Sequence, residues 1–222
     1  MGFKLHNFYM NSAGRRVRTV LHLKNIPFDY VSVDISPASE AQLGDAYGKI
    51  NPMRLIPTLE HDGVLLTESL AICDYLEELY PTPSLYPADR MERAHAKAIA
   101  MTVAAAIHPL HNTRVMKYLG QSLHLDQKAS AEWYVHWADK GLHALEALIE
   151  RAEQSRQEDG PFVFGKVPSI ADIFILPQIE NYKKLGLNLE PYARVCRVVD
   201  ACNIHPAFIK AAPENQPDFP SP

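Results

Sequence analysis

A serine and an asparagine stand where a predicted strand gives way to a predicted helix, in the segment Tyr9-Met-Asn-Ser-Ala-Gly14. At such a junction, backbone N–H groups and the positive end of the helix dipole face whatever occupies it. The hydroxyl of Ser12 can donate a hydrogen bond to an anion there, and a thiolate is stabilised by the same groups. The alternative interpretation is that Asn11 and Ser12 only cap the helix.

Two further segments carry groups that could contact a ligand. Pro57 follows Ile56 at the mouth of a predicted strand. A cis peptide bond there would expose backbone donors and acceptors, although an ordinary edge-strand proline fits the pattern as well. Glu68 and Ser69 end one predicted strand and open a helix. The Ser69 hydroxyl and the helix N–H groups would hold a carboxylate, and Glu68 could accept from an ammonium group; a simple helix cap is the alternative.

The elements that position these residues alternate in type over the first eighty residues. The hydrophobic pattern predicts strands at 4–9 and 28–33, a helix at 15–24, a polar helix-compatible stretch at 36–49, a hairpin of 56–60 and 64–67 joined through Asp62-Gly63, and a helix at 69–79. This order predicts a small α/β domain.

A proline-rich connector at residues 80–87 separates this domain from a second part, whose hydrophobic pattern is different. Apolar residues at helical spacing then predict helices at 90–119, 126–156, 169–184 and 192–202, the third of which starts with the capping box Ser169-Ile-Ala-Asp172. The sequence therefore predicts an α/β domain over residues 1–82 and an all-helical domain over residues 90–222.

Composition narrows the class of protein. The 222 residues are 47% hydrophobic and 22% charged, which is typical of a globular protein and not of a disordered or fibrous chain. A formal net charge of −4 argues against nucleic-acid binding. The longest apolar stretch, residues 98–107, is too short to cross a bilayer, and the first residues lack the pattern of a signal peptide. We expect a cytoplasmic protein with no nucleic-acid or membrane partner.

The three cysteines are too few for a disulfide framework, and none precedes Cys73. Cys73 stands on the apolar face of its predicted helix, where we expect a buried and unreactive thiol. His108 and His111 form an H-x-x-H pair, but the sequence places no third ligand beside it. We therefore expect no metal site.

The order and spacing of these motifs resemble the thioredoxin-like domain of a glutathione transferase. The resemblance is carried by the serine-bearing loop, Asn51-Pro-Met-Arg-Leu-Ile-Pro-Thr-Leu59, Asp62-Gly63 and Thr67-Glu-Ser-Leu-Ala-Ile-Cys-Asp-Tyr-Leu-Glu77. Four further motifs are similar to those of the zeta class: Arg16-Val-Arg18, His108-Pro-Leu-His-Asn112, Leu176-Pro-Gln178 and Gln216-Pro-Asp218. The zeta class contains maleylacetoacetate and maleylpyruvate isomerases. The resemblance implies an α/β thioredoxin-like domain followed by an all-α domain, glutathione as cofactor and a homodimer.

The resemblance also implies roles for individual residues. The active-site loop of the family, typically Arg-Ser-Ser-Cys-Ser, corresponds to Met10-Asn11-Ser12-Ala13-Gly14, so that Ser12 or Asn11 would donate to the glutathione sulfur. The γ-glutamyl end of glutathione would lie at Glu68 and Ser69, and its cysteinyl backbone against Ile56, next to Pro57. Further glutathione contacts would involve Gln42, His108 and Asn112.

For an isomerase of a maleyl-type diacid, relatives supply arginines at three positions. This chain has Met10, Arg114 and Lys184 at the corresponding places. Lysine gives a positive charge without the bidentate fork of arginine, and methionine gives neither. This departure hints at a less charged or more aromatic substrate.

Three functions are consistent with the sequence. The first is a glutathione-dependent cis–trans isomerase of maleylacetoacetate or maleylpyruvate in the breakdown of aromatic compounds. The second is a glutathione transferase, thiol lyase or dehalogenase acting on an aromatic or α-halo acid. Ala13 argues against the dehalogenase, because relatives use a cysteine of this loop to resolve a glutathione adduct. The third is a glutathione-transferase-like binding protein without catalytic activity.

Overall fold

The computed structural model describes residues 2–220, which form two compact units. One unit comprises the residues up to Leu85 together with those from Asn203 onward, and the other is Tyr86–Cys202. The sequence predicts that residues 203–222 belong to the helical domain, whereas the described part of this segment belongs to the first unit. The contacts that hold it there are given below.

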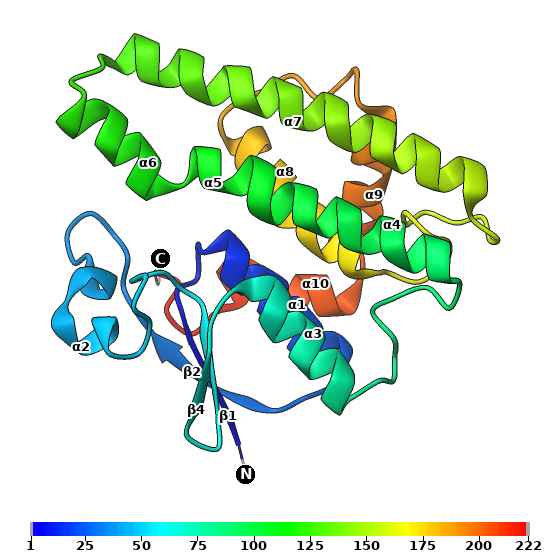
Figure 1. Cartoon of the computed structure of the whole chain (residues 1–222), viewed down its shortest axis with the longest axis horizontal. Helices are drawn as coiled ribbons and strands as arrows, with labels where there is room; N and C mark the ends of the chain where they lie inside the picture. The colour runs from blue at the N-terminus through cyan, green and yellow to red at the C-terminus, as the bar shows by residue number, and fades with distance from the viewer. Residues whose placement is uncertain (1, 221–222) are drawn as a thin grey trace. The chain divides into compact units, whose positions relative to one another are not determined.

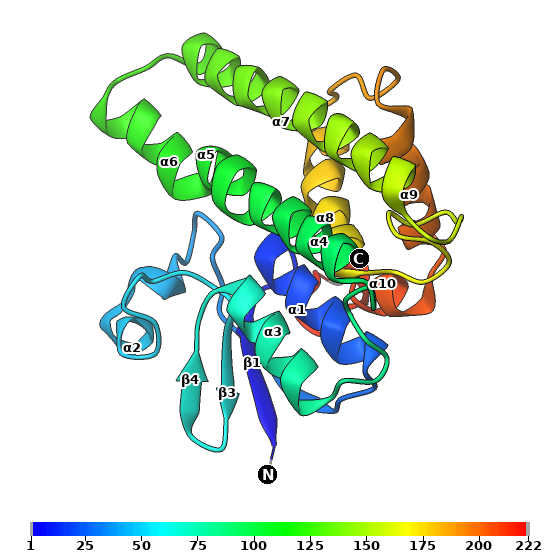
Figure 2. The same ribbon diagram turned by 45° about the vertical axis from the view of Figure 1, so that its right-hand side comes forward.

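The first unit is built on a four-stranded sheet with the strand order β2-β1-β3-β4 (Figures 1 and 2). The strands are β1 (Phe3–Asn7), β2 (Phe28–Ser32), β3 (Thr58–His61) and β4 (Val64–Leu66). β1 is parallel to β2 and antiparallel to β3, and β3 and β4 form the predicted hairpin. The turn residues Asp62 and Gly63 both have positive φ, 50° and 84°, as tight hairpin turns require.

Helices cover both faces of this sheet. α1 (Ser12–Leu23) and α3 (Ser69–Leu79) lie side by side on one face, and a 3-10 turn (Ala41–Leu43) with the short α2 (Asp45–Gly48) lies on the other side (Figure 2). The fully buried core lies between the sheet and the helix pair and includes Leu5, Val17, Leu59, Ile72 and Leu76. The helix-compatible stretch at 36–49 forms only these two short turns, because it offers only Tyr47 as a buried apolar anchor.

The last part of the chain packs against the first unit. α10 (Pro206–Lys210) contacts α1, and a 3-10 turn follows at Pro213–Asn215. Asp218 accepts hydrogen bonds from the Tyr30 and Ser32 hydroxyls on β2, at 2.9 and 2.7 Å. The fully buried guanidinium of Arg18 on α1 donates to the backbone carbonyl of Ala211. These contacts explain why the tail belongs to the α/β unit.

The histidine at the start of α10 makes folding stability dependent on pH. His205 caps the helix: its Nδ1 accepts a hydrogen bond from the Ala207 N–H at 3.3 Å, so this nitrogen must be unprotonated. Burial lowers the pKa of His205 below 6.5 in the folded protein. As the pH falls below 6.5, the unfolded chain therefore binds a proton that the folded chain does not, and folding stability decreases.

Substitution of His205 by asparagine, a good helix cap that does not titrate in this range, should make the free energy of unfolding less dependent on pH between 6.5 and 5. Urea denaturation at several pH values measures this dependence. An unchanged slope in the variant would show that the protonation of His205 is not linked to folding.

The second unit is helical (Figure 1). Its α-helices are α4 (Arg90–Met101), α5 (His108–His111), α6 (Thr113–Lys117), α7 (Gln127–Ser155), α8 (Ile170–Lys184) and α9 (Ala193–Asn203), and π-helical turns occupy Thr102–Ile107 and Tyr118–Ser122. The predicted helix at 90–119 is therefore broken. Asn112 has an extended conformation and its side chain caps α6, which interrupts the helix at that residue.

α8 forms the centre of the second unit. The predicted capping box is present, because Ser169 and Asp172 exchange hydrogen bonds and start the helix. Asp172 is fully buried and also accepts the Val163 N–H at 2.9 Å. Every residue from Ile170 to Ile179 is buried, which explains why the apolar residues of this helix follow no single face.

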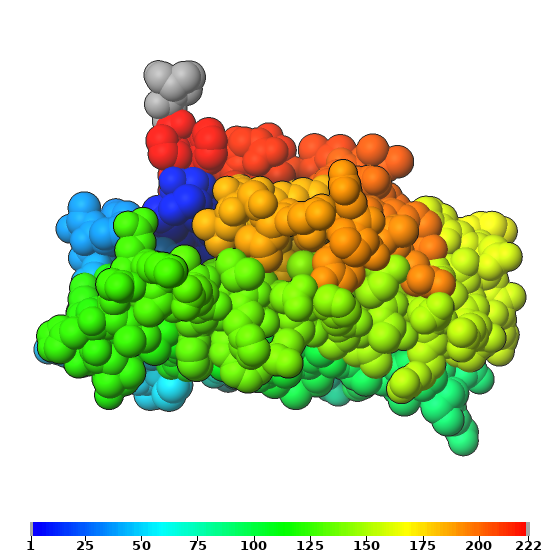
Figure 3. All heavy atoms as spheres, turned by 90° about the horizontal axis from the view of Figure 1, so that it is seen from above, coloured from blue at the N-terminus to red at the C-terminus, as the bar shows by residue number. Residues whose placement is uncertain are grey.

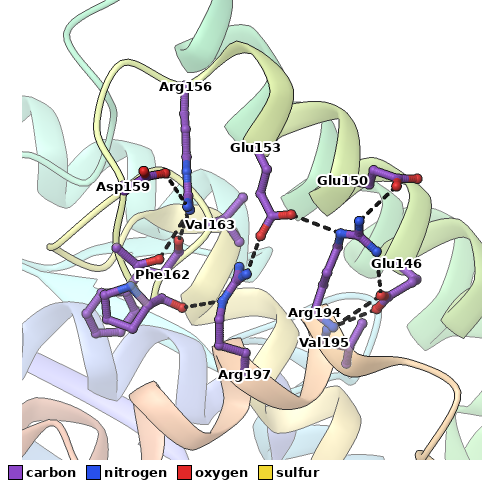
Figure 4. Close-up of polar contacts among 12 residues, drawn as sticks. Glu146, Glu150, Glu153, Arg156, Asp159, Phe162, Val163, Arg194, Val195 and Arg197 are labelled. Atoms are coloured by element: carbon purple, nitrogen blue, oxygen red, sulfur yellow. Dashed lines mark hydrogen bonds and ion pairs between the residues drawn. The ribbon is translucent and has the colours of Figure 1, made fainter.

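Ion pairs join α7 to α9 (Figure 4). In the space-filling view of Figure 3, the green to yellow-green spheres of α7 lie at the surface next to orange spheres of the segment that leads into α9. Arg194 contacts Glu146, Glu150 and Glu153 at 3.2, 2.8 and 2.9 Å, and Arg197 also contacts Glu153. Burial alone would raise the pKa of Glu153, but the hydrogen bonds from the two arginines together lower it. Because every acid in this cluster is paired with an arginine, we interpret the cluster as structural.

Candidate functional site in the α/β unit and candidate residues of the helical unit

The sheet register brings the three predicted site segments of the first unit to one edge. His6 near the end of β1 pairs with Thr58 at the start of β3, so the loop after β1 lies beside Ile56 and Pro57. Leu66 at the end of β4 pairs with Leu59, so the chain from Thr67 onward leaves the sheet at the same edge. The antiparallel pairing of β3 with both neighbours therefore places these segments together.

Ser12 and Asn11 start α1, as the sequence predicts. Asn11 is the N-cap residue, and its side-chain oxygen accepts the N–H of Gly14. Ser12 is the first helical residue and is 8% exposed. The N–H groups of the first helical turn carry a partial positive charge that favours an anion such as a thiolate. Because the Asn11 oxygen caps the helix, the groups that could donate to a sulfur are the Ser12 hydroxyl and the Asn11 amide nitrogen.

Position 14 must be a glycine, because the side chain of Asn7 lies directly against it. A Cβ atom at this position would lie 1.8 Å from Oδ1 of Asn7, the last residue of β1. Asn7 is fully buried, and neither polar atom of its side chain has a hydrogen-bond partner among the described residues. The close contact between Asn7 and Gly14 thus fixes the first turn of α1 against the end of β1.

The Ile56–Pro57 peptide bond is cis. Both residues are buried, and Pro57 directly precedes β3. Two side chains anchor the segment before it: the Tyr47 hydroxyl and the Asn51 amide both donate to the Leu55 carbonyl, at 3.0 and 2.6 Å. Burial raises the pKa of Tyr47, which keeps this hydroxyl in its donating form.

Glu68 and Ser69 form the start of α3. Glu68 has φ 66° and ψ 114°, a conformation that is unfavourable for a residue with a side chain and is typical of ligand-binding sites. Ser69 is 7% exposed and accepts a hydrogen bond from Nη1 of Arg16 at 3.3 Å. Because Arg16 can only donate, the Ser69 hydroxyl can direct its own proton to an acceptor such as a carboxylate.

Arg16 adds a buried positive charge behind this helix start. Its side chain is 1% exposed, and burial lowers its pKa to about 10 although Cys73 and Glu68 act in the other direction. An anion held at Ser69 would stabilise this charge. Cys73 itself is fully buried and its pKa is raised by burial, as expected for an unreactive thiol. In the sequence, Arg16 stands out only as part of the Arg16-Val-Arg18 motif, which does not predict its contact with Ser69.

Gln42 lies on the 3-10 turn of the first unit and is half-buried. Its side-chain oxygen is buried without a hydrogen-bond partner among the described residues. A buried acceptor without a partner is costly, and a ligand donor at this position would satisfy it.

The remaining predicted residues are distributed over the second unit and the loop after β1. His108 opens α5 and contacts Gln178 on α8, and the Asn112 side chain accepts the N–H of Arg114 at 3.1 Å as a helix cap. Arg114 and Lys184 are exposed, Lys184 at the end of α8. In the first unit, Met10 is 53% exposed. Met10 therefore belongs to the first unit, and His108, Asn112, Arg114 and Lys184 belong to the second.

The described residues were also searched for metal sites and for membrane-spanning helices. Among residues 2–220, no group of three or more histidine, cysteine or acidic side chains is arranged to hold a metal ion. Within the same residues, no helix has the length and apolar character needed to cross a membrane.

Comparison with known proteins decides the family. The family model "Glutathione S-transferase, N-terminal domain" matches residues 5–84. The maleylpyruvate isomerase of Ralstonia sp. is 37% identical over 215 residues, which cover 97% of this chain and 99% of that protein. The holo structure of a maleylpyruvate isomerase, described as a bacterial glutathione S-transferase in the zeta class, superimposes with a TM-score of 0.90 at 36% identity, covering 98% of this chain and 100% of the other. The chain belongs to the zeta-class glutathione transferases.

A second zeta-class structure bears on the cofactor. The maleylacetoacetate isomerase of Anaeromyxobacter dehalogenans 2CP-1, solved with glutathione in its active site, has a TM-score of 0.85 and 34% identity, with coverage of 99% of this chain and 98% of that chain. The family confirms the predicted fold, a thioredoxin-like domain followed by a helical domain. The roles of single residues within this zeta-class chain stay predictions.

Proposed function

We propose that the protein is a glutathione-dependent cis–trans isomerase of a maleyl-type acid, maleylacetoacetate or maleylpyruvate. The observation that carries the proposal is the nearly full-length similarity to maleylpyruvate isomerase. The convergence of Ser12, Ile56 and Ser69 at one edge of the sheet supports it, because these are the positions at which the family resemblance places glutathione.

The residues of the first unit fit glutathione. Ser69, the N–H groups at the start of α3 and the buried Arg16 suit the γ-glutamyl carboxylate, and Glu68 suits the ammonium group. The backbone of Ile56 suits the cysteinyl residue, and the buried oxygen of Gln42 can accept from a ligand N–H. We propose His108 and Asn112 as further contacts from the second unit.

Bound glutathione supplies a thiol sulfur that can add reversibly to the activated double bond of a maleyl-type acid. The task of the chain is to hold that sulfur as a thiolate and to bind the diacid. Ser12, through its hydroxyl at the positive end of α1, stabilises the negative charge on the sulfur, with the Asn11 amide nitrogen as the other available donor. Arg114 and Lys184 would attract the substrate carboxylates, and Met10 would contact its apolar part.

Arg114 gives a prediction for substrate binding. Replacing Arg114 by alanine should lower kcat/KM for the anionic substrate by about tenfold, because a hydrogen bond to a charged group contributes on the order of 1.5 kcal/mol. The KM for glutathione should stay unchanged. Steady-state kinetics with each substrate varied in turn make the comparison, and Arg90→Ala, at another exposed arginine, is the matched control. Equal kinetics in the two variants would remove Arg114 from the substrate site.

The proposed function is tested by binding and by activity. The purified protein should be retained on glutathione resin, and stopped absorbance assays with maleylacetoacetate and maleylpyruvate should show turnover of at least one of them. Failure of both experiments would exclude the isomerase. Retention on the resin without turnover would favour the second function below.

One observation favours a different substrate class. Met10 is exposed at the position where relatives carry a loop arginine, so the chain offers less positive charge to a diacid. A transferase or lyase acting on an aromatic acid is therefore the second candidate. Its dehalogenase variant lacks a resolving thiol, because position 13 is alanine. A binding protein without activity is the third possibility, and turnover of any substrate would exclude it.

The assembly and location of the protein are part of the proposal. We propose a homodimer that acts in the cytoplasm in the breakdown of aromatic compounds, as the resemblance to zeta-class enzymes implies. Light scattering of the purified protein measures the mass in solution, and a monomer at working concentration would contradict the dimer.

A further inference from the structure

The motif Gln216-Pro-Asp218, near the end of the first unit, forms a turn that is joined to the helix before it. The Phe219 N–H donates to the Gln216 carbonyl at 3.1 Å and closes the turn. The buried side-chain amide of Gln216 donates to two backbone carbonyls at and just after the end of α10, both at 2.8 Å. Residues 216–219, called the tail turn below, are therefore an ordered element and not a loose end.

Two side chains of the tail turn contact other parts of the same unit. Asp218 accepts hydrogen bonds from the hydroxyls of Tyr30 and Ser32 on β2. Phe219 stands edge-on to the ring of Tyr9, with 5.3 Å between the ring centroids. In Figure 3, the red spheres of the tail lie next to the dark blue spheres of the first part of the chain. The tail turn therefore contacts both β2 and the loop that joins β1 to α1.

The β1–α1 loop, residues 8–11, is a tight turn whose carbonyls are held by Arg18. The Asn11 N–H donates to the Phe8 carbonyl at 2.9 Å and closes the turn. Arg18 on α1 donates to the same Phe8 carbonyl through Nη1 at 3.3 Å, and to the Tyr9 carbonyl through Nη2 at 3.1 Å. Because α1 begins directly after this turn, a change in the turn shifts the first residue of the helix.

Arg18 connects the tail to this loop. Its guanidinium is planar, so that fixing two of its N–H groups fixes the direction of the others. Nε and Nη2 both donate to the Ala211 carbonyl, at 3.2 and 3.0 Å, while Nη1 and Nη2 also reach the loop carbonyls. Burial lowers the pKa of Arg18 to about 10, and Tyr30 and Asp218 act in the other direction. The tail thus orients the guanidinium and stabilises its positive charge.

We propose that the tail turn fixes the conformation of the β1–α1 loop through Arg18 and Tyr9, and thereby positions Ser12 for its contact with the glutathione sulfur. The role at Ser12 rests on the proposed function, whereas the effect on the loop does not. Asp218 and Phe219 are positioning residues, because they act through Arg18 and Tyr9. A tail that only completed the core would affect the stability of the whole unit, and the loop no more than the rest.

The effect on the loop can be measured without any ligand, by hydrogen exchange of the backbone amides followed by mass spectrometry. Phe219 is 43% exposed, so that Phe219→Ala leaves no large buried cavity. Exchange in peptides that contain the β1–α1 loop should become about tenfold faster in this variant, and exchange in β3 and α3 should stay unchanged. Glu214→Ala, at an exposed position of the same tail, is the matched control. Equal exchange of the loop in both variants would overturn the proposal.

Asp218→Ala tests the same coupling from the β2 side. The variant loses the acceptor for the Tyr30 and Ser32 hydroxyls and the negative charge that favours charged Arg18. Exchange should become faster in the tail turn and in the β1–α1 loop alike. Faster exchange in the tail turn with an unchanged loop would contradict the coupling. Equally faster exchange in β3 and α3 would also contradict it, because the tail would then support the unit as a whole.

The thiol of bound glutathione provides the readout at the site. Ultraviolet absorbance against pH measures its pKa, which Phe219→Ala should raise, and kcat/KM for the isomerisation should fall by about tenfold because the donor is displaced. Phe219→Tyr, which keeps the ring, should restore both values.

The two levels of the proposal can fail separately. An unchanged thiol pKa in a Phe219→Ala protein whose loop exchanges faster would overturn the positioning of Ser12. An unaltered protein that does not bind glutathione would contradict the proposed function and leave the effect of the tail turn on the loop standing.

Discussion

Replacing Ser12 by alanine is expected to lower kcat/KM of the glutathione-dependent isomerisation by about 100-fold. The Ser12 hydroxyl is the one buried at the start of α1, where helix N–H groups already favour a thiolate. Loss of one hydrogen-bond donor to a developing negative charge has an effect of about this size in other enzymes. Stability should change little, since the Asn11 side chain supplies the helix cap.

Asn11→Ala is the comparison that locates the donor. Because Asn11 caps α1, its loss should destabilise the folded protein by about 1 kcal/mol and leave kcat within a fewfold of the unaltered enzyme. Ser12→Thr, which keeps the hydroxyl, should retain more activity than Ser12→Ala. Thiolate formation in the glutathione complex, followed by ultraviolet absorbance against pH, separates an effect on the sulfur from an effect on substrate binding. If Asn11→Ala abolishes the thiolate and Ser12→Ala does not, the two roles are exchanged.

Replacing Arg18 by methionine is expected to destabilise the protein by about 3–5 kcal/mol. The guanidinium of Arg18 is fully buried and donates to three backbone carbonyls, those of Phe8, Tyr9 and Ala211, at 3.0 to 3.3 Å. Methionine fills a similar space but leaves these carbonyls without the donors. Burial lowers the pKa of Arg18 to about 10.

Urea denaturation of the Arg18 variant measures the loss, and limited proteolysis should show cleavage beyond residue 203, because Arg18 holds the tail at Ala211. Arg18→Lys retains the charge but not the fork that reaches three acceptors, so it should be intermediate. Arg90→Met, at an exposed position, should change stability by less than about 0.5 kcal/mol. An Arg18→Met protein as stable as Arg90→Met would contradict the role of this network.

Local signals explain which elements could be predicted from the sequence. The Asp62-Gly63 turn, the capping box of Ser169 and Asp172, and the helix at 69–79 depend on neighbouring residues, and the structure has all of them. The break at Asn112 was not predictable from periodicity, since the apolar spacing continues across it. The attachment of the tail to the first unit was also missed, because it depends on partners far away in sequence, such as Tyr30 for Asp218 and Arg18 for Ala211.

The same distinction holds for the candidate site. The motif positions predicted Ser12, Ile56 and Ser69, and the strand order explains why these residues lie at one edge. The contacts behind them could not be predicted from one sequence. Arg16 reaches Ser69 over 53 positions, and Gln178 reaches His108 over 70. One local feature of the Leu-Pro-Gln motif does mark Gln178. It is a polar residue in an otherwise apolar run, and it directly follows a proline inside a helix.

The central claim is that the reactive sulfur comes from glutathione, because the chain has no cysteine before the buried Cys73. The most direct measurement is the conversion of maleylpyruvate and of maleylacetoacetate to their trans isomers, followed by nuclear magnetic resonance, with glutathione, without it, and with S-methylglutathione. We predict that a trans product forms from at least one acid only when glutathione with a free thiol is present. No trans product with glutathione, or equal conversion with S-methylglutathione, would contradict the account.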